Sequence, residues 1–466
     1  MTKATRRNLV VEHINRRIRS RTLGPGDKLP SVRGLASTLN MSPSTVVEAY
    51  DVLAAEGAIW ARRSSGFFVA DKAQPFAVSQ TGPQLDREVD SLWVARQSID
   101  TENELTKPGC GWLPSDWMPV DALRRAMRQV ARANNTVLTD YGSAQGHRNL
   151  RHLIARKLHD QSNDVDPDCI LLTNSGSQAL DLVCRFLLSP GDTVLVDDPC
   201  YFNFHALLRA HQIKIVSVPY TPKGPDLAAL EDTLKDKRPR LYLTNSALHN
   251  PTGATLSAAT AHRVMSLAET HDLIIVEDSI FSEFEPALSP RLAALDGHNR
   301  VLTIGSYSKT LSASLRCGHI VARRDWIEAL TDLQVATNFG GPSPMVSEVL
   351  HTALTDGSYR KHMETLITRL DQRRAQMTNE LGALGLKPWV KPRGGFYLWC
   401  ELPNQIDAAT VARVSLTKGA VFAPGNVFSA SQSKSSFMRF NVSQLEPEHL
   451  KILGEVTKTG DTANVI

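Results

Sequence analysis

The chain has 466 residues, of which 42% are hydrophobic and 21% charged, and its formal net charge is +4. This composition is typical of a globular protein with a sizeable core, and the length predicts more than one domain. No run reaches the roughly 18 apolar residues that a membrane helix needs, and the basic N-terminus carries charges where a signal peptide would be apolar. We therefore expect a cytoplasmic protein without a membrane segment.

Charge is distributed unevenly along the chain. Residues 1–72 (the head) hold twelve Lys and Arg against six Asp and Glu, a balance of +6, whereas the remainder holds 40 and 42, a balance of −2. A basic head fits a polyanionic partner, although a solvated basic face would have the same charge. The six cysteines lie far apart without a CxxC pair, so we expect neither structural disulfides nor a metal site.

The head contains three helical patterns followed by a hairpin pattern. Apolar residues at helical spacing predict helices around Val10–Ile18 and Val32–Leu39. A third helix opens at Ser42-Pro43, an N-cap followed by a proline in the first helical position, and stops at Gly57. Short apolar segments on either side of RRSSG then predict a hairpin with a basic tip. The whole predicts a winged helix-turn-helix, although a small helical bundle without a role in DNA binding has the same helix pattern.

In a helix-turn-helix the N-terminal end of the second helix contacts bases in the major groove. Here that end carries Ser44 and Thr45, and we expect Arg33 and the hairpin residues Arg62 and Arg63 to lie close to phosphates.

A resemblance strengthens this interpretation. The run LGPGDKLPSVRGLASTLNMSPSTVVEAYDVLAAEGAI, followed by RRSSGFFVA, resembles the DNA-binding head of the GntR family almost end to end. The resemblance implies that Arg33 contacts duplex DNA. It also implies a basic residue at the opening of the third helix, where this chain has Pro43, so the preferred operator should depart from the family's habit.

Residues 73–104 show no strand alternation and begin with a polar stretch. We interpret them as a connector between domains that includes a short helix between Leu85 and Ile99, although the same residues could belong to the core of the following domain.

From about residue 168, short apolar strands alternate with amphipathic helices such as Ala179–Leu188 and Ala258–Thr270. This alternation predicts an α/β fold with a mainly parallel sheet, which usually binds its ligand at the carboxyl ends of the strands. The expected strands are Cys169–Thr173, Thr193–Val196, Ile213–Val218, Leu241–Thr244, Leu273–Val276 and Val301–Ile304.

Several polar motifs follow these strands. The run TNSGSQ (173–178) opens a helix and suits a phosphate, although many turns are rich in Ser and Gly. Asn250 in NPTG is fixed by a rigid turn, and Asp278 at a strand end suits a protonated pyridine nitrogen, although an ordinary turn and a helix cap would use the same residues. Lys309 in SYSK can bind an aldehyde covalently, and Arg316 can bind a phosphate. Taken together in this order, these groups are what a pyridoxal phosphate site needs.

The motifs NPTG, SYSKTLSASLRCG and PGDTVLVDDPCYFNF resemble aminotransferases of fold type I, and behind a GntR head they resemble a MocR-type regulator over nearly the whole chain. The resemblance implies a body of residues 105–466, with a large part at about 125–322 and a smaller α+β part at about 323–466. It also implies a homodimer that senses an amine, an amino acid or pyridoxal 5'-phosphate itself. The implied cofactor contacts are Lys309 to the aldehyde, Asp278 to the ring nitrogen, Asn250 to the phenolic oxygen, Tyr201 on the ring, and Ser177, Gln178, Ser306, Ser308 and Arg316 to the phosphate.

Two further residues complete the site implied by the resemblance. Tyr141 would reach the phosphate in the neighbouring subunit, and Arg439 in FMRFNVS would bind the carboxylate of a substrate or effector. The family usually places a Tyr two or three residues after the Asp, where this chain has Ile280 and Phe281. This departure disfavours rapid transamination but not cofactor binding. A working aminotransferase with an accessory head, and a vestigial body that only dimerises the heads, remain the alternatives.

Overall fold

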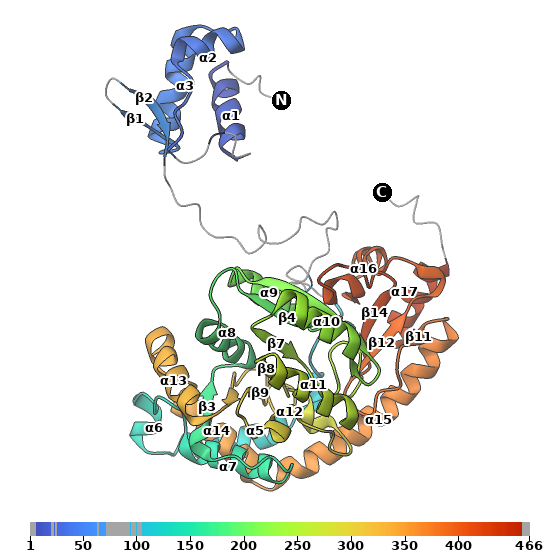
Figure 1. The fold of residues 1–466 in the computed structure, drawn as a ribbon. Helices are drawn as coiled ribbons and strands as arrows, with labels where there is room; N and C mark the ends of the chain where they lie inside the picture. The colour runs from blue at the N-terminus through green and yellow to red at the C-terminus, as the bar shows by residue number, and fades with distance from the viewer. Residues whose placement is uncertain are drawn as a thin grey trace. The chain divides into compact units, whose positions relative to one another are not determined.

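The computed structural model describes residues 6–19, 23, 26–62, 65–70, 94, 99 and 105–458. These residues form two compact units, one within residues 1–77 that contains the head and one within residues 78–466 that contains the body (Figure 1). Most of the connector, including its expected helix, lies outside the described residues.

The head has three helices and one hairpin. Ser31 caps α2, and Ser42 caps α3 by accepting a hydrogen bond from the Thr45 N–H at 3.2 Å. Strands β1 and β2 pair antiparallel, from Ile59 opposite Val69 to the basic tip. This arrangement confirms the expected winged helix-turn-helix fold. The elements are α1 (Arg6–Arg19), α2 (Val32–Leu39), α3 (Pro43–Ala55), β1 (Ile59–Arg62) and β2 (Gly66–Val69).

The core of the head forms where α1 crosses α3. Val10 and Ile14 on α1 and Val46 and Leu53 on α3 are fully buried, as their helical spacing predicts. Tyr50 is also buried, and its hydroxyl donates to the Pro30 carbonyl at 2.8 Å. The packing therefore holds the N-terminal end of α3 at the surface of the head.

The body is built on an eight-stranded sheet in the order β3-β10-β9-β8-β7-β4-β5-β6. The pairs from β9 through β8, β7 and β4 to β5 are parallel, whereas β10 runs antiparallel to both of its neighbours. The strands are β3 (Ile170–Thr173), β4 (Thr193–Asp198), β5 (Lys214–Thr221), β6 (Gly224–Pro225), β7 (Leu241–Thr244), β8 (Ile274–Asp278), β9 (Val301–Ser306) and β10 (Gly318–Val321).

Helices cover both faces of this sheet. Val194 and Val196 pack with α8 and α13, while the intervening Leu195 packs with α10 and α11, so alternate residues of one strand enter two separate cores. The helices of the large part are α5 (Val120–Val130), α6 (Asn135–Thr139), α7 (Arg148–His159), α8 (Gly176–Leu187), α9 (Phe202–Ala210), α10 (Leu227–Lys237), α11 (Ala258–Thr270), α12 (Leu292–Asp296) and α13 (Arg324–Asn338).

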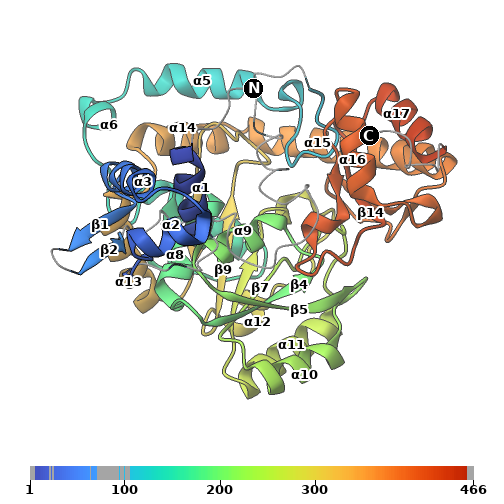
Figure 2. The same ribbon diagram turned by 90° about the horizontal axis from the view of Figure 1, so that it is seen from above.

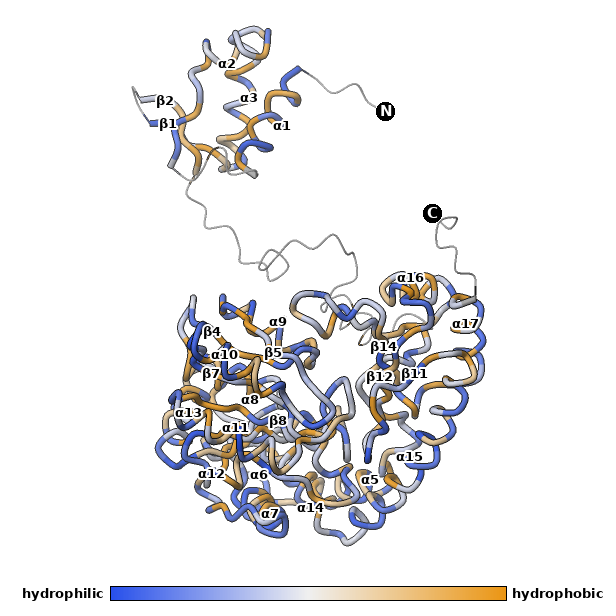
Figure 3. Tube along the Cα trace, turned by 45° about the vertical axis from the view of Figure 1, so that its right-hand side comes forward, coloured by the Kyte–Doolittle hydropathy of each residue, from blue (hydrophilic) through white to orange (hydrophobic). Residues whose placement is uncertain are grey.

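The C-terminal part of the body has a second, antiparallel sheet in the order β11-β12-β14-β13. The long helix α15 carries buried residues such as Met363, Leu366 and Leu370 on one side, and Figure 3 shows hydrophobic and hydrophilic residues alternating along it. Figure 2 shows α16, α17 and β14 grouped at one end of the body. The elements are α14 (Pro344–Thr355), α15 (Ser358–Ala383), β11 (Lys387–Pro388), β12 (Tyr397–Glu401), α16 (Ala408–Thr417), β13 (Ala423–Pro424), β14 (Phe437–Asn441) and α17 (Pro447–Lys458).

The fold agrees with the expected α/β class, and it contains strands that the sequence did not predict: β6, β10 and the four strands of the second sheet, β11 to β14. Strand β10 has only four residues, Gly318–Val321, and follows β9 after a loop rather than a helix, so strand-helix alternation does not predict it. Within the described residues, no helix is long and apolar enough to cross a membrane.

Candidate functional site

A cavity of about 560 Å³ lies beside the carboxyl ends of β7, β8 and β9, a volume in the range of small-molecule sites. Asp278 is the last residue of β8, Lys309 follows β9, and Asn250 lies in the turn after β7. The lining includes nine of the eleven residues expected around a cofactor and effector: Ser177, Tyr201, Asn250, Asp278, Ser306, Ser308, Lys309, Arg316 and Arg439.

One end of the cavity suits a phosphate. Helix α8 begins there at Gly176, where a Cβ would lie 2.9 Å from the Ile280 side chain, so glycine permits this close approach. The Ser306 hydroxyl lies 2.9 Å from the Ser308 hydroxyl, and Arg316 is exposed without a hydrogen bond or ion pair to any described residue. Backbone N–H groups at a helix start, hydroxyls and a free guanidinium are the donors that bind a phosphate.

Two expected phosphate contacts do not line the cavity. The Gln178 side chain accepts a hydrogen bond from the Asn174 N–H at 2.6 Å, inside the turn before α8. Tyr141 is 81% exposed and packs its ring edge against Phe339. The exposed ring is compatible with a contact to a second subunit, and both assignments stay predictions.

Asp278 is the acidic residue of the lining. It is buried, and one carboxylate oxygen accepts a hydrogen bond from the Ile280 N–H at 2.9 Å. Burial raises the pKa of Asp278 to about 6, because a charged carboxylate is poorly solvated there. Lys309 acts to lower this pKa, and a protonated pyridine nitrogen would supply a second opposite charge. Burial likewise raises the pKa of Tyr201, which keeps that lining ring neutral.

Lys309 faces the same space. Its Nζ donates to the Gly111 carbonyl at 2.5 Å, and burial lowers the pKa of Lys309 to about 8. The nearby guanidinium groups of Arg439 and Arg316 also lower this pKa, whereas Asp278 raises it. A lysine with this pKa is partly neutral near physiological pH and therefore nucleophilic.

Arg439 is a buried cation without a buried anion. It is 1% exposed, donates to the Asn250 side-chain oxygen and to the Gly109 carbonyl at 2.8 Å each, and leaves its Nε without a partner. No acidic residue of the described chain forms an ion pair with it, although a buried charge normally has a partner. A ligand carboxylate would fit this position.

The two residues that depart from the family pattern lie at the cavity itself. Ile280 and Phe281 both line it, so the position of the usual hydroxyl is apolar in this chain. Phe281 is buried and packs edge-on against Tyr397, with ring centres 5.4 Å apart.

Sequence reasoning missed the segment Gly109–Trp112 and Tyr397. Asn441 donates to the Trp112 carbonyl at 2.7 Å, which holds this segment against β14 and presents the Gly111 carbonyl to Lys309. A Cβ on Gly109 would lie 2.4 Å from the Ala423 backbone nitrogen, so the two glycines in PGCGW were the available signal. Every residue type has a backbone carbonyl, so contacts made by carbonyl groups are hard to recognise from the sequence.

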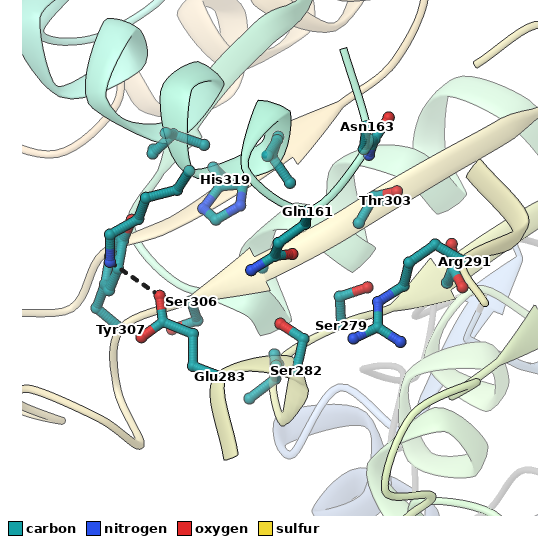
Figure 4. Close-up of a pocket in the computed structure, with 16 residues that line it drawn as sticks. Gln161, Asn163, Ser279, Ser282, Glu283, Arg291, Thr303, Ser306, Tyr307 and His319 are labelled. Carbon is teal, nitrogen blue, oxygen red and sulfur yellow. Dashed lines mark hydrogen bonds and ion pairs between the residues drawn. The ribbon is translucent and has the colours of Figure 1, made fainter. Parts of the chain in front are cut away.

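A second, smaller cavity of about 50 Å³ adjoins the first and shares Ile280 and Ser306 with it (Figure 4). Its lining includes polar groups: Lys157 forms an ion pair with Glu283 at 3.0 Å, and the Thr303 hydroxyl has no partner. This volume suits a few ordered water molecules and is too small for a cofactor.

The head presents the expected contact residues at its surface. Arg33, Ser44 and Arg62 are exposed and Thr45 is half-buried, at the starts of α2 and α3 and on the hairpin. Arg63 lies outside the described residues. Arg33 and Arg62 form no ion pair with a described residue, which leaves both free for phosphates.

Residues 6–69 match the family of bacterial regulatory proteins, gntR family, and residues 113–456 match aminotransferase class I and II. An uncharacterized HTH-type transcriptional regulator of Escherichia coli, YjiR, is 30% identical over 92% of this chain and 94% of its own length. The chain belongs to the MocR-type regulators.

The body of this MocR-type chain also resembles enzymes. A 2-aminoadipate transaminase of Thermus thermophilus is 29% identical over 72% of this chain and 85% of its own length. The crystal structure of LysN, an alpha-aminoadipate aminotransferase of the same species complexed with N-(5'-phosphopyridoxyl)-L-leucine, superposes with a TM-score of 0.72. That match has 26% identity and covers 78% of this chain and 94% of LysN.

Proposed function

We propose that the protein is a pyridoxal-phosphate-dependent DNA-binding transcriptional regulator that senses an amino acid or a related amine in its body. The observation that carries the proposal is the lining of the large cavity, where Lys309, Asp278 and Arg439 lie together with a free phosphate-binding end.

The lining fits the cofactor group by group. The start of α8 and Arg316 suit the phosphate, Asp278 suits the ring nitrogen, and Asn250 with Tyr201 would position the ring. When bound, pyridoxal phosphate supplies an aldehyde that forms a covalent bond with a primary amine. Lys309 is the amine that faces the cavity, and its lowered pKa supplies the neutral nitrogen that this bond requires.

The effector is an amine that competes with Lys309. Its carboxylate, when it has one, binds the free Nε side of Arg439, where a planar guanidinium gives a fixed geometry that lysine cannot reproduce. The rest of the lining includes Trp112, Phe202 and Phe204, which favour an amino acid with an apolar side chain.

We expect the protein to be a homodimer. Seven large apolar residues are exposed over α5, α6, α13 and α14, and such a group marks a protein interface. Because Tyr141 belongs to this group, a homodimer would place it at a shared edge. The seven are Val120, Met127, Leu138, Tyr141, Val335, Phe339 and Met345.

The second candidate function is a working aminotransferase with an accessory head, which the similarity to the Thermus thermophilus transaminase favours. Phe281 argues against rapid turnover because it offers no hydroxyl at the ring. Incubation with amino donors and keto-acid acceptors separates the two candidates: a regulator without turnover still changes its DNA affinity with the donor.

The proposed cofactor lysine is tested by borohydride trapping. Purified protein incubated with pyridoxal phosphate should absorb in the near-ultraviolet to visible range and yield one reduced adduct on Lys309 by mass spectrometry. Lys309→Ala should lose the adduct, whereas Lys223→Ala, which removes an exposed lysine away from the cavity, should keep it. An adduct at the same level in Lys309→Ala would overturn the assignment.

A further inference from the structure

Tyr397 is a buried aromatic residue next to the proposed effector clamp. It lies on β12, and its strand neighbour β14 carries Arg439 at the diagonal position, because Tyr397 pairs with Asn441 and Trp399 with Arg439. The guanidinium carbon of Arg439 lies 4.2 Å from the centre of the Tyr397 ring. The ring is therefore held in one orientation between a cation and Phe281.

The Tyr397 hydroxyl and the amine of Lys309 both lie close to Gly111. A Cβ placed on Gly111 would be 3.1 Å from the Tyr397 hydroxyl and 3.7 Å from Lys309 Nζ, so both groups flank the same point of the cavity. Lys309 Nζ also contacts the Gly111 carbonyl. One lysine nitrogen thus has a backbone acceptor and a phenol in its immediate surroundings.

The hydroxyl forms no hydrogen bond with any described residue, although only 4% of Tyr397 is exposed. A buried tyrosine usually satisfies its hydroxyl on the protein, as Tyr50 does on the Pro30 carbonyl, and the buried Tyr220 hydroxyl, which has no partner, lies outside the cavity. The hydroxyl of Tyr397 instead faces the space that a ligand would fill.

We propose that Tyr397 is a catalytic residue of this site. Its hydroxyl, which has no partner among the described residues, turns to donate a hydrogen bond to the nitrogen of Lys309 and so supplies, from β12, a phenol that Phe281 does not offer. The proposal deepens the proposed function and rests on it, because Lys309 is the amine that the effector displaces. It assigns Tyr397 to the exchange itself rather than to the packing of Arg439.

The direction of the hydrogen bond follows from the protonation states. Burial raises the pKa of Tyr397 well above its usual value, so the phenol stays protonated, and the lowered pKa of Lys309 leaves part of the amine neutral near physiological pH. A protonated donor beside a neutral amine stabilises the neutral form. The other charged or titratable groups near Lys309 are Asp278, Arg316, Arg439 and Cys110.

The test measures the Lys309 amine in protein free of cofactor. The rate of reductive methylation of Lys309 by formaldehyde and cyanoborohydride, followed by mass spectrometry against pH, gives its pKa. Tyr397→Phe should raise that pKa by about 0.5 to 1 pH unit, the shift expected from losing one hydrogen bond. Tyr220→Phe, which removes a buried hydroxyl outside the cavity, should leave it unchanged. An unchanged or lowered pKa in Tyr397→Phe would overturn the proposal.

A second measurement keeps the ring in place. With 3-fluorotyrosine at position 397, the fluorine resonance should shift with a midpoint at the Lys309 pKa, and this step should vanish in Lys309→Ala. If the fluorine chemical shift shows the same pH dependence in the wild type and in Lys309→Ala, the proposal is contradicted. This outcome can be observed even if the Tyr397→Phe variant does not fold. Neither measurement uses the cofactor. Failure to bind pyridoxal phosphate would refute the proposed function, but the effect of Tyr397 on the pKa of Lys309 could still be measured.

Discussion

Asp278 gives a prediction that links pH to cofactor binding. Burial raises its pKa to about 6 although Lys309 acts to lower it, and a protonated ring nitrogen would lower that pKa further on binding. Binding then releases a proton from Asp278. The affinity for pyridoxal phosphate should therefore be higher above pH 6 than below it. A titration of affinity between pH 5 and 8 measures this.

The matched control uses a second, partly buried carboxylate. Asp278→Asn should weaken binding and flatten the step near pH 6. Asp198→Asn, whose carboxyl also has a pKa raised by burial but does not line the cavity, should keep the step. A step that persists in Asp278→Asn would assign it to another group.

Arg439 gives a prediction about effector chemistry. Arg439→Lys keeps the charge but loses the planar fork, so the response to an amino acid should weaken about 10- to 100-fold, the range for hydrogen bonds to a charged group. The response to the corresponding amine without its carboxylate should change little. Equal losses for both compounds would show that Arg439 stabilises the structure of the site and does not bind the carboxylate.

The proposed cofactor motifs could be placed from the sequence because each lies at or after the carboxyl end of a strand. Asp278 ends β8, and Asn250 and Lys309 follow β7 and β9. Once these parallel strands are predicted, the three residues are expected at the same edge of the sheet. Tyr397 could not be placed in this way. It belongs to a second sheet, and the contact between the two parts of the body depends on packing that no local pattern encodes.

At the scale of elements, the secondary structure was predicted where period and caps agreed. Helix α11 begins and ends at the predicted residues Ala258 and Thr270, and α3 begins at Pro43 after its Ser42 cap. Strand β10 was missed because antiparallel pairing on both sides is a tertiary feature. Segment 109–112 was missed because its contacts are made by backbone groups.

The start of α2 and the hairpin give a prediction about DNA binding. Arg33→Ala should weaken binding to duplex DNA about equally for all sequences and reduce the salt slope by about 1, as expected for one lost phosphate contact. Arg62→Ala should act in the same way. Arg360→Ala, which removes an exposed arginine of α15 in the body, is the control. Unchanged gel-shift affinity in both head variants would remove the phosphate assignment.

At the scale of the whole molecule, the exposed apolar group around Tyr141 predicts a homodimer with shared sites. Lys309→Ala and Tyr141→Phe chains, refolded together, should form heterodimers with one site that lacks both groups and one that is intact. Mixing should therefore restore tight cofactor binding at about one site per heterodimer. A monomer at micromolar concentration with full cofactor occupancy would contradict the shared site.

The central claim is that an amine at Lys309 in the body changes how the head binds DNA. The most direct test is operator affinity, on a duplex selected by the protein itself, with and without neutral amino acids in the wild type and in Lys309→Ala. Coupling between two sites is typically about 1–3 kcal/mol, so the wild type should change its affinity roughly 5- to 150-fold with the effective amino acid. Lys309→Ala should bind the operator and lose that change. An equal response in Lys309→Ala would show that sensing does not run through this lysine.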